Sequence, residues 1–161
     1  MTYKSSLDRM ATAITSTVTI VFAALIQRPG WLPSLGNNAV STVVGVFLFV
    51  VYFFCLGLRP RAYTLTGSEL VISRMFSNVH IPREDMETVE AFSQERRGTI
   101  RIFGVGGLFG YFGKYGVAGR GPMTWYVTRK DRMVLIELRG EKKIVISPDD
   151  RELFIEALRA S

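Results

Sequence analysis

The side chains best suited to catalysis or metal binding are few in this chain. Its 161 residues include one histidine, His80, and one cysteine, Cys55. His80 stands between Val79 and Ile81 in a segment of alternating apolar residues, which favours a structural or solvent-facing histidine over a general base. Transition-metal sites are built mainly from several histidine and cysteine ligands, and a disulfide needs two cysteines. We therefore predict no metal, no disulfide and no cofactor.

The acidic side chains do not indicate a catalytic pair either. Glu84, Asp85, Glu87 and Glu90 lie close together in the sequence, but this grouping is typical of a solvated turn and strand face. A catalytic carboxylate pair needs a cleft that holds both groups around a substrate, and the sequence indicates none. We therefore expect that the protein is not an enzyme.

A glycine-rich tract is the most unusual segment of the chain. A dinucleotide-binding G-x-G-x-x-G motif that began at Gly104 would need its third glycine where Phe109 stands, and no helix follows. We therefore exclude nucleotide binding by this tract. A period of three is neither that of a strand nor that of a helix, and a collagen helix would need proline in the repeats. The period-three glycines are Gly104, Gly107, Gly110, Gly113, Gly116 and Gly119.

The aromatic rings of this tract have three possible destinations. The tract can be a wide loop that folds its rings onto the neighbouring strands, or its rings can insert among lipid headgroups with help from nearby basic residues. It can also form a contact surface for a protein partner or for the N-terminal part of the chain. The candidate membrane or partner contacts are Phe109, Tyr111, Phe112, Lys114, Tyr115 and Arg120.

Basic residues form a second candidate surface. From Arg61 onward the chain has 16 Lys and Arg against 13 Asp and Glu. This mild excess suits an anionic membrane surface, where each nearby basic residue contributes about 1 kcal/mol. It is too weak for nucleic acid, which needs a concentrated basic face. The candidate basic patch, at predicted strand turns, is Arg96, Arg97, Arg129, Lys130 and Arg132.

Two long apolar stretches must position these groups. Residues 10–26 and 39–58 contain no charged side chain, and as helices they would be roughly 25 and 30 Å long, close to the thickness of the hydrocarbon core. We predict two transmembrane helices that form a hairpin, because the segment between them, QRPGWLPSLGNN, contains two prolines and two glycines. A cleaved signal peptide is the alternative for the first stretch; the absence of a cleavage site favours a retained helix.

The flanking charges predict the orientation of the hairpin. Lys4 and Arg9 precede it, Arg59 and Arg61 follow it, and Arg28 alone lies in the turn. Positive residues concentrate on the cytoplasmic side of membrane proteins. We therefore expect a multi-pass protein of the bacterial cytoplasmic (inner) membrane with both termini in the cytoplasm.

After Pro60 the pattern changes to short alternating segments separated by turns, which predicts about seven antiparallel strands. Ser147, Pro148 and the acidic pair that follows are typical of a helix start, and Phe154, Ala157 and Leu158 then repeat at helical spacing. The fold class is therefore α+β. Residues 1–60 form the helical hairpin and residues 61–161 form a β-rich domain that ends in an amphipathic helix.

Residues 63–158 resemble a bacterial pleckstrin-homology (PH) domain, and the stretches that carry the resemblance are YTLTGSELVISR, NVHIPREDMETVEAF and IVISPDDRELFIEALR. The tract RIFGVGGLFGYFGKYG also resembles a segment of one subgroup. The resemblance implies an antiparallel β-barrel closed by the C-terminal helix, commonly fused to one or two transmembrane helices. Phosphoinositide-binding PH domains carry basic residues in the first turn. This turn, Thr66-Gly67-Ser68-Glu69, has none, so we do not carry that activity over.

Two functions follow as hypotheses. In the first, the protein is a non-enzymatic, membrane-anchored PH-like module at the cytoplasmic face. Its partners are the lipid bilayer, anionic lipid headgroups, and another protein or a second copy of itself. In the second, the hairpin assembles into a small channel or transport accessory, and the PH-like domain controls its assembly or gating. A conducting path needs charged residues within the helices, and their absence favours the first hypothesis.

Overall fold

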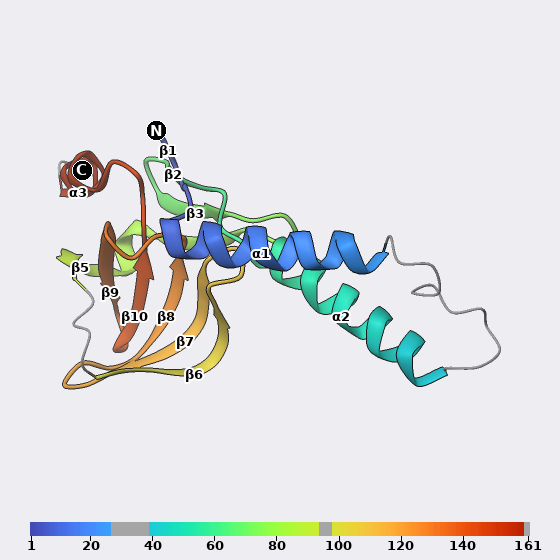
Figure 1. Ribbon diagram of the computed structural model, residues 1–161. Coiled ribbons are helices and arrows are strands. Elements are labelled where there is room, and N and C mark those ends of the chain that lie inside the picture. The colour runs from blue at the N-terminus through green and yellow to red at the C-terminus, as the bar shows by residue number, and fades with distance from the viewer. Residues whose placement is uncertain (27–38, 94–97, 160–161) are drawn as a thin grey trace.

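The computed structural model describes residues 1–26, 39–93 and 98–159, and side chains are not described for residues 25–42. Two long helices follow a short first strand, and nine further strands lead to a C-terminal helix (Figure 1). The elements are β1 (Thr2–Lys4), α1 (Arg9–Ile26), α2 (Ala39–Leu58), β2 (Ala62–Leu65), β3 (Glu69–Ser73), β4 (Val79–Pro82), a 3₁₀ turn (Arg83–Asp85), β5 (Met86–Phe92), β6 (Thr99–Gly106), β7 (Tyr111–Val117), β8 (Gly121–Val127), β9 (Met133–Leu138), β10 (Lys142–Ile146) and α3 (Arg151–Arg159).

The first sheet has four antiparallel strands in the order β1-β2-β3-β4. Alternate residues of β2 and β3 are buried, as the period of two in a strand requires: Tyr63 and Leu65 on β2, and Leu70 and Ile72 on β3. These side chains form one hydrophobic cluster with residues of β9, β10 and α3. The main core therefore lies between the first sheet, the second sheet and the C-terminal helix.

The second sheet has six strands in the order β5-β9-β10-β8-β7-β6. Its pairs are antiparallel except β10 with β8, which is parallel, with Val145 opposite Trp125. The prediction of an entirely antiparallel meander is wrong at this point. The reason is that β9 follows β8 in the chain but pairs with β5 and β10, so β10 fills the place beside β8 and runs in the same direction.

The predicted closed barrel is also corrected. The described strands form two open sheets, and their hydrogen bonding ends at β1, β4, β5 and β6. β4 and β5 are consecutive in the chain, but the 3₁₀ turn Arg83–Asp85 separates them and each joins a different sheet. Figure 1 shows the second sheet as a curved layer, with β6 and β7 at the end nearest the two long helices.

The glycine-rich tract forms a strand hairpin, β6–β7, and not the wide loop that we considered. Gly104 and Gly113 face each other across the two strands, with φ of +129° and +126°. A Cβ on Gly104 would lie 2.2 Å from the carbonyl oxygen of Phe112, and one on Gly113 would lie 2.3 Å from that of Phe103. Glycine is therefore required here, because the two backbones approach too closely for any side chain.

α1 and α2 extend away from the sheets (Figure 1). Within their described residues, no helix is both long and apolar enough to cross a bilayer. We therefore correct the prediction of two transmembrane spans to two long helices. The predicted turn of the hairpin falls on residues 27–38, outside the described residues.

The two long helices contact each other through Tyr52 of α2. Its hydroxyl group lies 2.8 Å from Oγ1 of Thr19, and its ring stacks on Phe22 with a centroid separation of 5.2 Å. Both of these partners belong to α1. The helices therefore form a pair, although their connection is not described.

The C-terminal helix confirms the predicted element but begins later than expected. α3 starts at Arg151, and the amide of Phe154 donates to the carbonyl of Asp150. Phe154 is fully buried, whereas its neighbour Leu153 is 60% exposed. Ser147, the predicted N-cap, lies outside the helix and has another role.

Candidate functional site at the junction of helices and sheets

The first eight residues connect the long helices to the β-rich region. β1 pairs with β2, so that Thr2 lies opposite Thr64 and Lys4 opposite Ala62. After β1 the chain crosses to the turn between β8 and β9, where the amide of Asp8 donates to the carbonyl of Thr128 (3.2 Å). We assigned this segment to the helical hairpin from the sequence. In space, its strand belongs to the first sheet.

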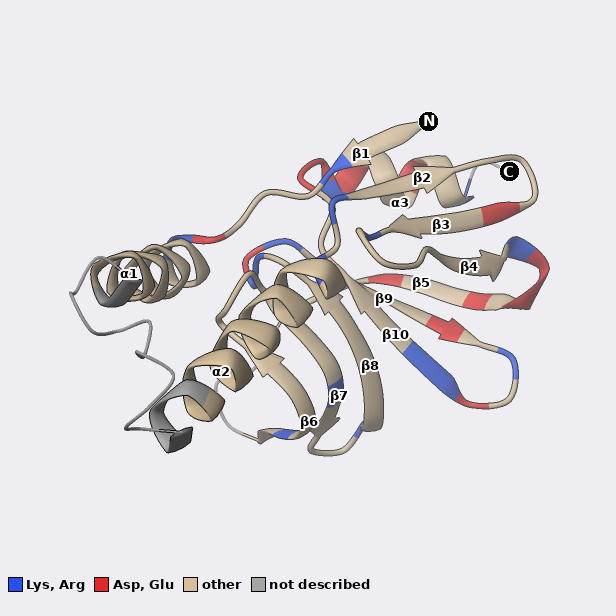
Figure 2. Cartoon of the chain, turned by 90° about the vertical axis from the view of Figure 1, so that its right-hand side faces the viewer, with Lys and Arg blue, Asp and Glu red and all other residues tan. Residues whose placement is uncertain are grey.

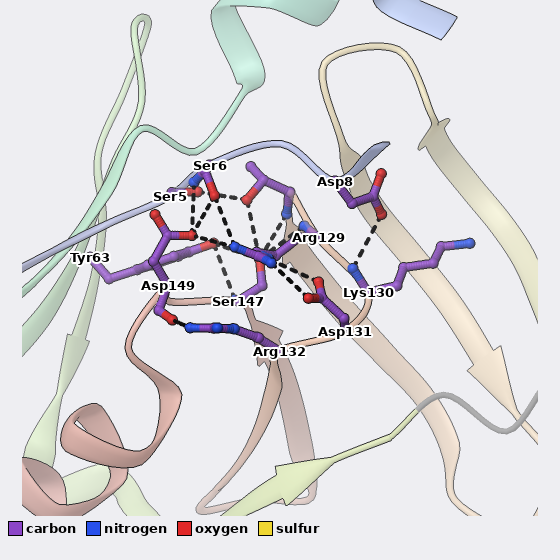
Figure 3. Close-up of polar contacts among 11 residues, drawn as sticks. Ser5, Ser6, Asp8, Tyr63, Arg129, Lys130, Asp131, Arg132, Ser147 and Asp149 are labelled. Atoms are coloured by element: carbon purple, nitrogen blue, oxygen red, sulfur yellow. Dashed lines mark hydrogen bonds and ion pairs between the residues drawn. The ribbon is translucent and has the colours of Figure 1, made fainter. Parts of the chain in front are cut away.

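Ser147 is at the centre of a buried polar cluster at this crossing (Figure 3). It is fully buried, and its Oγ accepts hydrogen bonds from the amides of Thr128 (2.8 Å) and Arg129 (3.3 Å). Ser5 adds a hydroxyl contact of 2.8 Å with Thr128. Tyr63 donates to the carbonyl of Tyr126 (2.6 Å), and burial raises the pKa of its phenol. Mutual hydrogen bonds therefore satisfy these buried groups, which is what makes their burial tolerable.

Arg129 links this cluster to two carboxylates. Its guanidinium group lies 2.7 Å from Asp131 and 3.2 Å from Asp149. Ser6 donates to the same oxygen of Asp149 at 2.5 Å, and Arg132 donates to the backbone carbonyl of Asp149. Figure 3 shows Arg129 between the two acidic side chains. Two members of the predicted basic patch, Arg129 and Arg132, therefore bind residues of their own chain.

Asp8 fixes the start of α1. Its Oδ1 accepts the amide of Ala11 (2.6 Å), as an N-cap residue does, and its Oδ2 accepts the amide of Lys130 (3.3 Å). The hydroxyl of Tyr111 also donates to Asp8 (3.4 Å), and burial together with this carboxylate raises the pKa of Tyr111 to about 12. The Nζ of Lys130 also lies 4.1 Å from the centre of the Tyr111 ring. Together these contacts form one small network that joins the start of α1, β7 and the β8–β9 turn.

The turn between β6 and β7, Gly107–Gly110, contacts both long helices. The amide of Phe109 donates to Oγ1 of Thr15 on α1 (2.9 Å), and the Phe109 ring packs edge-on against Tyr52 of α2, with centroids 5.1 Å apart. Phe109 has a φ of +58°, an unfavourable value for an aromatic residue. We call this turn the β6–β7 tip. It lies against the helix pair, and its backbone strain is held by contacts on both sides.

The structure separates the predicted contact residues into two groups. The four rings are buried: Phe109 and Phe112 lie in a cluster with Cys55 of α2, and Tyr115 stacks on Trp125 at 4.2 Å. The two basic side chains are exposed, and Arg120 forms an ion pair with Glu90. The rings therefore pack against the helices and the core. The buried rings are Phe109, Tyr111, Phe112 and Tyr115, and the exposed basic residues are Lys114 and Arg120.

The predicted basic patch is brought together only in part. Arg129, Lys130 and Arg132 lie in the cluster of Figure 3, whereas Arg96 and Arg97 are outside the described residues. Asp8 and Thr15 were missed in the sequence. An acidic residue directly before an apolar helix is a recognised N-cap signal, so Asp8 was open to prediction. The contact between Thr15 and the β6–β7 tip depends on residues 94 positions apart, and no local pattern indicates it.

Acidification should weaken the cluster at Asp149. Burial alone raises the pKa of this carboxyl group, but the hydrogen bonds from Ser6 and Arg129 outweigh it and lower the pKa below the ordinary value. The resulting stability is present above the unfolded pKa of about 3.9 and is lost as the pH falls through the lower folded pKa. We expect the urea concentration at the midpoint of unfolding to decrease in the wild type once the pH is below about 4. This decrease should be smaller in the Asp149→Asn variant. In the Asp150→Asn variant, which changes an exposed neighbouring residue, the decrease should be as large as in the wild type. Equal curves for all three proteins would contradict this assignment.

A family model described as "Bacterial PH domain" matches residues 61–161, which is more than half of the chain. The chain belongs to the bacterial PH domain family. No curated protein and no solved structure matches it. The matched PH domain begins just before β2, so β1 and both long helices lie outside it. Within the described residues, no group of three or more histidine, cysteine, aspartate or glutamate side chains could hold a metal ion.

Proposed function

We propose that this protein is a non-enzymatic PH module anchored by α1 and α2 at the cytoplasmic face of a bacterial inner membrane. There the PH domain acts in membrane-surface binding or in protein interaction. The observation that carries the proposal is the exposed apolar surface of the helix pair.

That surface is largest on α2. Ten large apolar side chains are exposed between Val43 and Phe54, and Val43, Phe47 and Val46 are 60% exposed or more. Soluble monomers rarely expose contiguous apolar patches of more than a few hundred Å² unless the patch binds a partner or a membrane. In Figure 2 the described parts of α1 and α2 carry no blue or red beyond the end nearest the PH domain. A surface without charge on any side favours the hydrocarbon of a bilayer over an aqueous protein interface.

The distribution of charge supports the orientation. Lys4 and Arg9 flank the start of α1, and Arg59 and Arg61 follow the end of α2. Both helix ends adjoin the PH domain (Figure 1). Basic residues are favoured at the cytoplasmic side, where they face anionic lipid. The PH domain would therefore lie on that side.

Membrane fractionation tests the anchor. We expect the full-length chain to remain in the membrane pellet after washing at high salt and at alkaline pH. Val46 and Val50 are exposed one turn apart on α2, and an unpaired charge is strongly disfavoured against hydrocarbon. The double variant Val46→Lys, Val50→Lys should therefore move into the supernatant.

The matched control is Leu153→Lys, which adds a charge to an equally exposed leucine on α3. It should stay in the pellet with the wild type. A wild-type chain in the soluble fraction, or a double variant that pellets as fully as the wild type, would refute the anchor.

β6 supports the second part of the proposal. It is the edge strand of the six-stranded sheet, and Ile100, Ile102 and Phe103 on it are each 60% exposed or more. An edge strand with exposed apolar side chains is a favourable place for contact with another molecule. Such a contact surface, next to the helix pair, suits an interaction module better than an enzyme.

A further inference from the structure

The edge of the second sheet formed by β6 carries positive charge and no negative charge. Residues 99–127, from the start of β6 to the end of β8, contain Arg101, Lys114 and Arg120 but no aspartate or glutamate. Arg120 pairs with Glu90 of β5, whereas Arg101 and Lys114 form no ion pair with a described carboxylate. In Figure 2, β6 and β7 carry blue and no red, and red lies on β5 and β9.

The two faces of β6 differ in chemistry. A Cβ on Gly116 of β7 would lie 3.5 Å from Cδ1 of Ile102, so Ile102 lies on the face of Gly116. A Cβ on Gly106 would lie 2.7 Å from Nη1 of Arg101 and 3.5 Å from the hydroxyl of Tyr115. Tyr115 and Gly116 are consecutive in β7 and therefore point to opposite faces. β6 thus presents isoleucine on one face and arginine on the other.

The isoleucine face adjoins a groove of about 600 Å³ between the end of α2 and the strands β6, β7 and β8. We call it the helix–sheet groove. Phe54 and Leu58 of α2 line it, together with Ile102 and Phe103 of β6. The register with β7 shifts between Arg101 and Phe103, and such a bulge re-aims a side chain, so two consecutive residues line the same groove. Phe103 is 79% exposed, which leaves the groove accessible from the edge of the sheet.

The backbone of β6 is unpaired along its outer edge. β6 pairs with β7 alone. Outside this pairing, the only hydrogen bond to a β6 backbone group within the described chain runs from the hydroxyl of Tyr115 to the carbonyl of Val105 (2.7 Å). The backbone groups of residues 99–103 that point away from β7 are therefore available to another strand. Strand addition takes its affinity from main-chain hydrogen bonds and its specificity from alternate side chains.

Charge determines which kind of strand fits this edge. A second copy paired through β6 would add a strand that also carries Arg101 and no acidic residue, and like charges on neighbouring strands are destabilising. The acidic edge strand of the same sheet, β5, is already engaged, because Arg159 donates to the carbonyl of Val89 (3.1 Å) and Arg120 pairs with Glu90. The complementary strand is therefore one with apolar side chains on one face and carboxylates on the other.

We propose that β6 binds an extended segment of another protein in which apolar residues alternate with acidic ones. Its backbone pairs with the outer edge of β6. Its apolar side chains lie on the face of the helix–sheet groove, and a carboxylate meets Arg101 on the opposite face. This inference rests on the protein-interaction part of the proposed function and names the chemistry of the partner.

Probe peptides test the choice of charge. The full-length chain is placed in nanodiscs of phosphatidylcholine, and fluorescence anisotropy measures the dissociation constant of a labelled peptide of alternating valine and glutamate. We expect this acidic probe to bind about tenfold more tightly than a probe with lysine in place of glutamate, because only the acidic probe complements the basic edge. In Arg101→Gln, Lys114→Gln the two probes should bind nearly equally. The matched control is Arg139→Gln, an exposed arginine in the β9–β10 turn, which should keep the full difference.

Two methylated versions of the acidic probe test the strand pairing. Methyl groups on the glutamate nitrogens block one edge of the probe, and methyl groups on the valine nitrogens block the other, because successive amides of a strand point to opposite edges. Only one edge can pair with β6. One version should therefore bind as the unmodified probe does, and the other about tenfold more weakly through its lost hydrogen bonds. Equal binding of all three probes would overturn the proposal.

The groove and the competing occupants are tested with a third variant. Phe103→Ser changes an exposed side chain, so the fold should hold, and the acidic probe should bind about tenfold more weakly for loss of apolar contact. Leu153→Ser, at an exposed leucine of α3, should bind as the wild type does. Unchanged binding in Phe103→Ser would contradict the proposal. Displacement of the probe by phosphatidylglycerol vesicles would assign the edge to lipid instead, and paired copies that Phe103→Ser separates would assign it to a second chain. All variants should still pellet with membranes, so loss of probe binding is distinct from loss of the anchor.

Discussion

Gly113→Ala is expected to destabilise the PH domain by about 3 kcal/mol or more, because an L-residue is strained at this φ and the new methyl group has no space. The φ of Gly113 is +126°, and its Cβ would lie 2.3 Å from the carbonyl oxygen of Phe103. That oxygen belongs to the facing strand, so the two strands would have to separate. The measurement is the urea midpoint of the full-length chain in detergent, followed by tryptophan fluorescence, since Trp125 is buried on the adjacent strand β8.

Gly116→Ala is the matched control, three residues further along the same glycine repeat. The nearest atom to its added Cβ is Cδ1 of Ile102 at 3.5 Å, an ordinary contact, and its φ is not positive. We expect a change within about 1 kcal/mol, since alanine also restricts the unfolded chain. Equal losses in the two variants would show that the close approach of Gly104 and Gly113 is not what requires glycine.

Phe154→Ala is expected to cost about 3–5 kcal/mol, the usual range for removal of a fully buried phenylalanine. Its ring is in the main hydrophobic cluster and meets Tyr3 edge-on, with centroids 5.1 Å apart. The loss should detach α3 from both sheets. Urea unfolding followed by circular dichroism measures the shift of the midpoint.

The neighbour Leu153 supplies the control for this prediction. It lies on the same helix but is 60% exposed, so Leu153→Ala should change the free energy of unfolding by about 0.5 kcal/mol at most. An equal shift of the midpoint in Leu153→Ala and Phe154→Ala would show that the face of α3 that carries Phe154 is not the face that packs on the sheets.

Local patterns predicted the regular elements well. Alternation and turn residues predicted a series of short strands after Pro60, and the apolar stripe predicted the C-terminal helix; the described residues contain both. β1 was missed because three residues, Thr2–Lys4, are too few to show a period. Their partner strand, β2, also lies about 60 positions away, and such pairing leaves no local signal.

The glycine-rich tract was misjudged for a different reason. Strand prediction relies on side chains that alternate between two faces, and glycine contributes to neither face. In β7, Tyr111, Phe112 and Tyr115 are all buried, so strict alternation is also absent. The positive φ values at Gly104 and Gly113 arise from pairing across the hairpin, which a single stretch of sequence does not reveal.

The basic residues show the same limit at the candidate site. Arg129, Lys130 and Arg132 were predicted at strand turns, as part of a candidate basic patch. Arg129 and Arg132 instead bind acidic or carbonyl groups of their own chain, and their partner Asp149 comes from a distant part of the sequence.

The pairing of β1 with β2 also changes how the parts of this chain should be divided. Since Lys4 lies opposite Ala62, the whole helix pair is an insertion between two neighbouring strands of one sheet. A fragment cut at the start of the family match would leave one side of β2 without its hydrogen-bonding neighbour and would remove Tyr3 from the Phe154 ring. A helix-free version is better made by excising the insertion and joining the ends of β1 and β2 with a short loop. The smallest complete folding unit is therefore discontinuous in sequence.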